Sequence, residues 1–268
     1  MANIQNNAAL GAFADTGQWR LILAISPTGM SGLLKNILQP DAGLLPIFHR
    51  MWDADADLLD MVRQTVYDNP RMLDDFSTQI VITSPRTLWI PTELTEYEEF
   101  DENFYTSFYK AEYEDIFADF DDDEVCLYSP APGLNSYLSR TLPGCRVCSH
   151  LSILKNHYRS VAAEGTHLFI DLREGECDLL AFSGGRLLSA ASHPCNSSEE
   201  AAKYVDLLQK AYRLNSSDIR VHIYGGEESA GSLRERLSAP TGPVDLEVHP
   251  TDLRENGITH AMLLAAEK

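Results

Sequence analysis

Three short apolar runs between residues 167 and 192 restrict this chain to a small set of folds. Residues 167–172, 177–182 and 186–192 are each short enough to form one strand, and glycine-bearing segments separate them. Glycine supplies the positive φ that tight hairpin turns need, so the pattern predicts two consecutive hairpins. A helix and a fourth strand at 219–224 follow, which gives the order β-β-β-α-β.

A capping box marks the start of the helix in this stretch. Ser197 can accept a hydrogen bond from a free amide of the first turn, and Glu200, three residues later, can reach back to the chain. One apolar stripe recurs at helical spacing in Ala201, Tyr204, Val205, Leu208, Ala211 and Tyr212. The single stripe predicts one helix face packed on a sheet, and Asn215 is the residue expected to end the helix in the left-handed conformation.

The same order of elements occurs earlier in the chain. Strands are predicted at 19–25, 31–38 and 44–52. A helix capped by Asp53 or Asp55, with Leu58, Leu59, Val62 and Val66 on one face, and a fourth strand at 79–83 follow. The two copies match in element order and spacing, without strong sequence identity. The pattern therefore predicts a duplicated α/β fold, and the strands of a sheet covered on both faces read as continuous apolar runs. The residues expected in the core of the second copy are Leu168, Phe169, Ile170, Val221 and Ile223.

The remaining elements are predicted from local pattern. The expected strands are 87–90, 124–129, 146–149 and 244–248. The expected helices are 100–120, as one helix or a pair, 134–141, 151–163 and 229–237, before a tail at 251–267 with a helical end. The predicted organisation is a polar tail at 1–18, a first half at 19–150 with an acidic insertion at 93–124, and a second half at 151–268.

Length, cysteine count and charge limit the classes of function. The 268 residues suit one large domain or two ordinary ones, and no apolar run approaches the roughly 20 residues of a membrane helix. Five cysteines fit a reducing cytosol better than a disulfide scaffold, so a cytoplasmic location is expected. The net charge of −19 repels phosphate backbones and anionic lipid, which argues against nucleic acid and membrane surfaces as partners.

Much of this charge lies in one segment. Residues 93–124 contain fourteen acids and one base, Lys110. We interpret the segment as a solvated helix face with Phe104, Phe108 and Phe117 turned inward, followed by a self-repelling loop at 121–124. A docking surface for a basic partner and a calcium site are the alternatives, although the glycine and later glutamate of a calcium loop are missing.

Two successive β-β-β-α-β-α units resemble the actin-like ATPase superfamily over roughly residues 19–250. The resemblance implies two ribonuclease-H-like halves, each a mixed five-stranded sheet flanked by helices. The superfamily includes sugar and acyl kinases, heat-shock chaperones, actins and the bacterial proteins PilM and FtsA. Within it, the chain is most similar to a small bacterial family of uncharacterised proteins. The implied cofactor is ATP with magnesium, bound between the halves.

The superfamily carries an Asp-x-Gly motif in the first hairpin of each half, where it serves the phosphates and the metal. The matching segment of the first half, 24–29, has no acid, and its Pro27 has no amide hydrogen to donate. In the second half, 171–175, Asp171 is kept, but Arg173 stands where glycine would let the backbone approach a phosphate. The resemblance therefore implies a damaged phosphate site.

The adenosine motif of the superfamily is a glycine pair after the fourth strand, and Gly225, Gly226 and Glu227 match it. A tight turn alone also explains such a pair. Asp171 would bind a divalent cation or orient a water if it is functional, and would cap a turn amide if it is structural. The predicted binding residues are Asp171, Gly225, Gly226 and Glu227, with no catalytic residue assigned.

Two further groups of residues suggest metals. Asp171, Asp206 and Glu227 could supply the carboxylates of a two-metal site, but such sites act on phosphodiesters, which the net charge of −19 disfavours.

The second group is Cys145 and Cys148 with His150, which would be half of a zinc motif completed by His193 and Cys195. Because a closed zinc site usually shows two regular pairs, small buried residues at a domain junction are the favoured interpretation. No metal site is predicted.

The sequence therefore favours a cytosolic protein of actin-like fold that binds a partner, most simply another protein. Its nucleotide site is expected to be degenerate, either non-catalytic or weakly binding. The alternative is an active ATPase or small-molecule kinase of the same superfamily.

Overall fold

The computed structural model describes residues 15–39, 41–53, 55–95, 101–112, 115–173, 175–238, 245–250 and 257–267. The chain divides into two compact units. One takes Met1–Ser152 and Asn256–Lys268, and the other takes Ile153–Glu255. Unlike the predicted second half, 151–268, the second unit ends before the C-terminal segment. Among the described residues, no helix is long and apolar enough to span a membrane.

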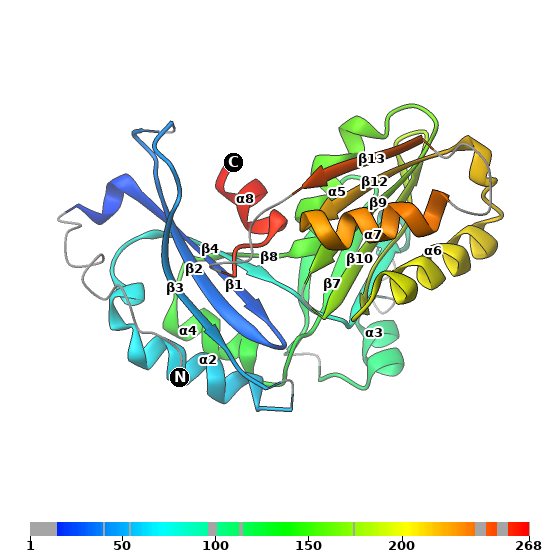
Figure 1. The fold of residues 1–268 in the computed structure, drawn as a ribbon. Helices are drawn as coiled ribbons and strands as arrows, with labels where there is room; N and C mark the ends of the chain where they lie inside the picture. The colour runs from blue at the N-terminus through cyan, green and yellow to red at the C-terminus, as the bar shows by residue number, and fades with distance from the viewer. Residues whose placement is uncertain are drawn as a thin grey trace. The chain divides into compact units, whose positions relative to one another are not determined.

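The main sheet of the first unit has five strands in the order β3-β2-β1-β4-β8 (Figure 1). They are β1 (Trp19–Ser26), β2 (Gly29–Asn36), β3 (Leu45–Met51), β4 (Ser77–Ile82) and β8 (Arg146–Ser149). The first three are antiparallel neighbours, whereas β4 runs parallel to β1 and β8 runs parallel to β4. The sheet is therefore mixed, as predicted.

One face of this sheet packs against α2 (Leu58–Asp68) and α4 (Leu134–Thr141). Buried apolar residues of β1 and β4 meet the apolar stripes of both helices, and the cluster includes Leu21, Leu23, Ile80, Ile82, Val62 and Leu138. Helix α8 (His260–Glu267) also contacts β1 and β4, and five of its eight residues are buried. The C-terminal helix therefore belongs to the core of the first unit.

A small third sheet has the order β5-β7-β6 and lies in the same unit with helix α3 (Asp101–Tyr109). Its strands are β5 (Thr87–Pro91), β6 (Phe117–Phe120) and β7 (Glu124–Tyr128). The prediction of helix throughout 100–120 is wrong, because its last residues form β6. There Phe117 is buried and its ring stacks on Tyr128 at 5.4 Å between centroids.

The predicted inward stripe of α3 is also wrong. Phe104 and Phe108 are 47% and 66% exposed, whereas Tyr105 is fully buried. The hydroxyl of Tyr105 donates to the Arg86 carbonyl at 2.8 Å, and that of Tyr109 donates to the Thr87 carbonyl at 3.0 Å. Tyrosine can thus place its apolar ring in the small core while its hydroxyl satisfies a backbone group, which phenylalanine cannot do.

The acidic segment contains both solvated and structural carboxylates. Asp115 accepts a hydrogen bond from the Gly133 amide, and Asp119 accepts from the Ser149 amide at 2.7 Å and from the Tyr128 hydroxyl at 3.1 Å. Burial raises the pKa of Asp119, and these hydrogen bonds oppose the rise. Asp122 and Asp123, by contrast, are exposed in the turn between β6 and β7.

Replacing both exposed acids, Asp122→Asn with Asp123→Asn, should change the free energy of unfolding by less than about 0.5 kcal/mol, because solvated charges contribute little. Urea titrations followed by circular dichroism measure this change. A loss above about 1 kcal/mol, or a calcium-dependent rise in stability that the double variant abolishes, would contradict a solvated turn.

The sheet of the second unit has the order β11-β10-β9-β12-β13. Its strands are β9 (Thr166–Arg173), β10 (Glu176–Ser183), β11 (Arg186–Pro194), β12 (Ile219–Gly225) and β13 (Asp245–Pro250). Antiparallel pairing joins β9, β10 and β11, and parallel pairing joins β9, β12 and β13. The β-β-β-α-β order of the first unit is thus repeated, which confirms the predicted duplicated fold class.

Both faces of the second sheet are covered. Leu168, Ile170, Val221 and Ile223 pack against α6 (Ser198–Tyr212) and α7 (Glu227–Ser238), which lie together along one face (Figure 1). On the other face, Phe169 stacks on Tyr158 of α5 (His150–Val161) at 4.1 Å between ring centroids. All five predicted core residues are at most 1% exposed, so that prediction is confirmed.

Helix α6 begins as predicted and ends two residues early. The Ser197 hydroxyl accepts from the Glu200 amide at 3.2 Å, and the Glu200 carboxylate accepts from the Asn196 amide at 2.7 Å. At the other end Arg213, not Asn215, is left-handed, with φ 53°. The Leu214 amide donates to the Gln209 carbonyl at 2.9 Å, and Leu214 packs on the core, so this apolar contact sets where the chain turns.

Removing the cap, Ser197→Ala, should lower the free energy of unfolding by about 1 kcal/mol. The matched control is Ser160→Ala in α5, an exposed serine whose hydroxyl bonds to the His157 carbonyl of its own helix. That change should be near neutral, because alanine is the better helix former. Equal losses in the two variants would show that the Ser197 hydroxyl does not stabilise the helix start.

Candidate functional site

The predicted binding residues of the second unit lie at the carboxyl ends of β9 and β12. These strands are parallel, and Asp171 is opposite Tyr224. Gly225 and Gly226 come next after Tyr224 in the sequence and therefore lie near Asp171. Asp171 is only 4% exposed. In open α/β sheets this strand end is the usual place for ligands, so the topology brings Asp171, Gly225 and Gly226 to a suitable edge. Glu227 comes next, exposed in the first turn of α7.

Arg173, in the hairpin that follows Asp171, binds two acidic side chains. Its guanidinium binds both oxygens of Asp178, with Nε to Oδ2 at 3.0 Å and Nη2 to Oδ1 at 2.7 Å. Its Nη1 reaches Glu176 Oε2 at 2.7 Å, and the Ser192 hydroxyl also donates to Asp178. Burial alone lowers the pKa of Arg173, but attraction by Asp178 and Glu176 outweighs burial and raises it. The guanidinium therefore stays charged and bound to the two acids.

Replacing Arg173→Ala should lower the free energy of unfolding by about 3–5 kcal/mol, because Asp178 is fully buried and would lose its countercharge. Arg173→Lys should recover only part of the loss, since an ammonium cannot reproduce the bidentate geometry. The exposed pair Lys203 and Glu199, at 2.9 Å, supplies the control: Lys203→Ala should cost less than about 1 kcal/mol. Denaturant unfolding measures the loss in free energy of unfolding for the three variants. A loss in Arg173→Ala no larger than that in Lys203→Ala would refute the predicted order.

Gly225 has a structural reason to be glycine. Its φ is 143°, and a Cβ at this position would lie 2.9 Å from Leu172 Cβ and 3.1 Å from the Leu172 carbonyl oxygen. The Gly226 carbonyl accepts from the Ala230 amide at 2.9 Å and from the Ser229 hydroxyl at 3.0 Å, which starts α7. Close strand packing and a helix start therefore account for the glycine pair, and a ligand role stays a prediction.

The first hairpin of the chain uses its polar groups internally. The Thr28 amide donates to the Ser26 hydroxyl at 3.3 Å, and the Ser26 hydroxyl donates to the Gly29 carbonyl at 3.2 Å. The indole of Trp52 donates to the Pro27 carbonyl at 2.9 Å. This turn contains no acid, and the amide at Thr28 is already hydrogen-bonded.

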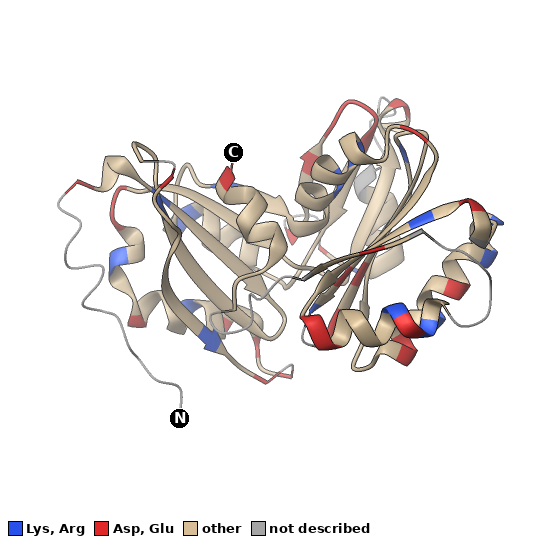
Figure 2. Cartoon of the chain, turned by 45° about the horizontal axis from the view of Figure 1, so that its top comes forward, with Lys and Arg blue, Asp and Glu red and all other residues tan. Residues whose placement is uncertain are grey.

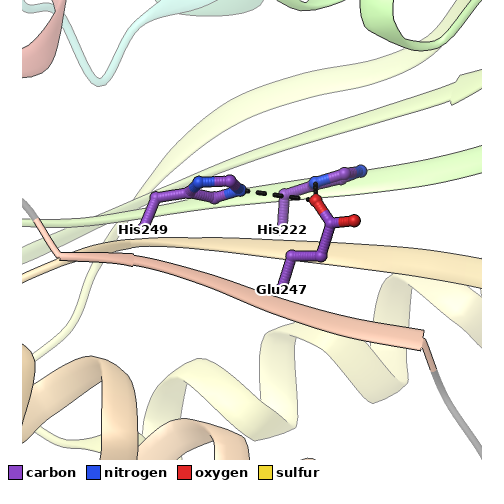
Figure 3. Close-up of side chains that lie close together, drawn as sticks. All are labelled: His222, Glu247 and His249. Carbon is purple, nitrogen blue, oxygen red and sulfur yellow. Dashed lines mark ion pairs between the residues drawn. The ribbon is translucent and has the colours of Figure 1, made fainter.

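A cluster that the sequence analysis missed lies on β12 and β13. His222 Nδ1 is 3.0 Å from Glu247 Oε2, and His249 Nε2 is 3.6 Å from the same oxygen (Figure 3). Burial lowers the pKa of His222, and the nearby Glu247 opposes this effect. The available signal was Glu247-x-His249, which places both side chains on one face if the predicted strand 244–248 extends by one residue. Only the pairing of that strand with β12 adds His222.

The cysteine motif does not form a metal centre with its histidine. The Cys148 sulfur is buried and accepts from the Gln79 amide group at 3.4 Å, and Cys145 is half-buried. In the second unit a hydrogen bond from the Cys177 thiol lowers the pKa of Cys195 to about 6, and His193 stacks on Tyr204 at 4.3 Å between centroids. These residues make local packing contacts and hydrogen bonds.

Over the part of the chain that the structure describes, one group of three or more close His, Cys, Asp or Glu ligand atoms occurs, and it is His222, Glu247 and His249. The set of Asp171, Asp206 and Glu227 considered for two metals does not assemble. The Asp206 carboxylate instead binds Lys210 Nζ at 2.5 Å on the surface of α6.

Comparison with other proteins agrees with this fold. A family model described as "Protein of unknown function (DUF3822)" matches residues 13–239. No protein with a curated description matches the sequence. A Bacteroides thetaiotaomicron VPI-5482 protein with actin-like ATPase fold and unknown function is similar at TM-score 0.77 and 19% identity, over 95% of this chain and 98% of that one.

A second similar structure is the PilM–PilN type IV pilus biogenesis complex, at TM-score 0.54 and 12% identity, over 88% of this chain and 89% of that one. At these identities the likeness shows the fold alone. The predicted actin-like ATPase fold is therefore confirmed.

Proposed function

The chain belongs to this family of unknown function, and we propose that it is a partner-binding module whose nucleotide site is degenerate. Arg173 is the observation that carries the proposal. Its guanidinium already binds Asp178 in two places and Glu176 in one. A side chain engaged in this way cannot give the open, glycine-lined backbone that a phosphate loop requires.

The charge at this hairpin supports the same conclusion. Asp171 and Asp178 are neighbours in register on β9 and β10, and both are buried. With Glu176 they make three carboxylates around one guanidinium, so a phosphate approaching the hairpin would meet net negative charge. Glu227 and Glu228 add two acids in the first turn of α7, where a helix N-terminus would otherwise attract an anion.

Weak adenosine binding beside Gly225 and Gly226 stays part of the proposal, because these residues lie at the carboxyl ends of parallel strands. For the role of partner binding, the support is the PilM structure, which was solved in complex with PilN. Acidic residues lie on helices and loops of both units (Figure 2), which disfavours nucleic acid as the partner. Five cysteines, an odd count for a chain of this length, fit a reducing compartment and support a cytoplasmic location.

The alternative function is an active ATPase or small-molecule kinase. The placement of Asp171 favours it, because a buried carboxylate at the carboxyl end of a central strand could hold magnesium or orient a water. The two functions differ in whether Asp171 supports turnover.

A phosphate-release assay with ATP and magnesium on the purified full chain separates them. We expect no turnover above background, and a thermal shift at millimolar ATP well below that of a saturated site, for which binding at a hundred times Kd stabilises a fold by roughly 2.7 kcal/mol. Asp171→Asn keeps the shape of the buried side chain, and Asp206→Ala is the surface control.

Turnover that persists through purification, is lost in Asp171→Asn and is retained in Asp206→Ala would make the protein an enzyme and overturn the proposal. Activity that is equal in all three proteins would point to a contaminant, and the proposal would then stand.

A further inference from the structure

We propose that His222, Glu247 and His249 form a binding site for one divalent transition-metal ion, with zinc as the expected occupant. The site lies within the second unit, on β12 and β13, and does not depend on whether the protein binds nucleotide. Figure 3 shows the three side chains turned toward one another.

The strand register brings the ligands together. In the parallel pair of β12 and β13, His222 is opposite Glu247, and His249 follows two residues later on the same strand as Glu247. Residues two apart in a strand point to the same face, so all three side chains project from one side of the sheet. This is the face that carries Phe169, not the face packed on α6 and α7.

Two separations between ligand atoms are close to those around a tetrahedral ion. A metal–nitrogen or metal–oxygen bond of about 2.1 Å in tetrahedral geometry places neighbouring ligand atoms about 3.4 Å apart. The two separations from Glu247 Oε2, 3.0 Å to His222 Nδ1 and 3.6 Å to His249 Nε2, lie on either side of that value. All three ligand atoms are within 4.8 Å of one another.

A chain of hydrogen bonds orients His222. The His167 ring has a hydrogen-bond partner at each nitrogen. Nε2 is 2.9 Å from the Glu164 carbonyl oxygen, and Nδ1 is 3.0 Å from His222 Nε2. A carbonyl oxygen can only accept, so Nε2 of His167 carries a proton. In the neutral ring Nδ1 then accepts from His222 Nε2, which leaves the lone pair of His222 on Nδ1, facing Glu247. Such an outer partner commonly fixes a metal-binding histidine.

Aromatic contacts hold both imidazoles in place. Phe169 stacks on His222 with centroids 4.6 Å apart and an interplanar angle of 9°, and Tyr224 stacks on His249 at 4.5 Å and 15°. A site whose ligands are already oriented loses less side-chain entropy on binding. The geometry is therefore largely present before any ion arrives.

An ion pair would instead place a hydrogen on Nδ1 of His222 and would explain its 3.0 Å contact with Glu247, but it does not explain His249. Nε2 of His249 is shielded from solvent and makes no hydrogen bond, although a carboxylate oxygen lies 3.6 Å away. Burying a polar nitrogen without a partner costs free energy, and coordination to an ion shared with Glu247 would satisfy it.

The donor set selects the class of ion. Two imidazole nitrogens and one carboxylate oxygen suit zinc and similar first-row ions, whereas magnesium and calcium prefer oxygen ligands. Three protein ligands leave a fourth position for water or another ligand. The Glu247 side chain is 53% exposed, so an ion can reach the cluster from the side of this carboxylate.

Zinc titration of the metal-free full chain, prepared without a histidine tag and read against a chromophoric chelator, tests the site. We expect one zinc per chain, unaffected by excess magnesium. Glu247→Gln and His249→Ala should each weaken binding at least tenfold. His193→Ala, which removes another half-buried imidazole of the same unit, is the matched control and should bind as the wild type does.

Two further measurements test the coordination of the ion and the orientation of His222. Cobalt(II) should give the intense visible absorption of a four-coordinate site in the wild type and lose it in His249→Ala. His167→Gln, which touches no metal, should weaken zinc binding about ten- to a hundredfold through the orientation of His222.

The proposal is wrong if the folded wild type binds no stoichiometric zinc. It is also wrong if Glu247→Gln and His249→Ala, shown to be folded by circular dichroism, bind zinc as the wild type does. A loss confined to His193→Ala would place the metal elsewhere and would equally overturn the assignment.

Discussion

The register of β9 is the constraint on which the second unit depends. This central strand pairs antiparallel with β10 and parallel with β12, and its side chains alternate between two faces. Leu168 and Ile170 enter the core under α6 and α7, while His167, Phe169 and Asp171 face the other side. A slip of one residue would exchange these sets, placing His167 and Asp171 in the apolar core under α6 and α7, and Leu168 and Ile170 on the buried face that now carries Phe169.

Elements that short-range signals define could be predicted from the sequence. Glycine-bearing turns between apolar runs located the hairpins of both units, and the capping box located the start of α6. Predictions failed where two local patterns competed, or where a contact between residues far apart in sequence determined the structure. Phe104 and Phe108 have helical spacing, but Tyr105 is buried because its hydroxyl reaches the Arg86 carbonyl. Likewise Arg213 takes the left-handed position because Leu214 must reach the core.

The candidate sites also contain some features that local sequence patterns predict and others that depend on contacts between distant residues. Asp171, Gly225 and Gly226 lie at or next to the carboxyl ends of strands that the sequence marks clearly, so their place at this end of the sheet could be predicted. The partners of Arg173 could not, since they depend on which residues of β10 lie opposite. His222 and Glu247 are far apart in sequence and become neighbours only through the pairing of β12 with β13. No local pattern shows that pairing, so the cluster appears only in three dimensions.

Helix α8 completes the first unit after the whole second unit has passed along the chain. Translation delivers β1 and β4 early and the helix that covers part of their sheet last. During synthesis, the apolar surface that receives Met262, Leu264 and Ala265 therefore lacks this helix while the more than one hundred residues of the second unit are added. The first unit can therefore complete this part of its core only after α8 has been made, whereas the second unit consists of one continuous segment.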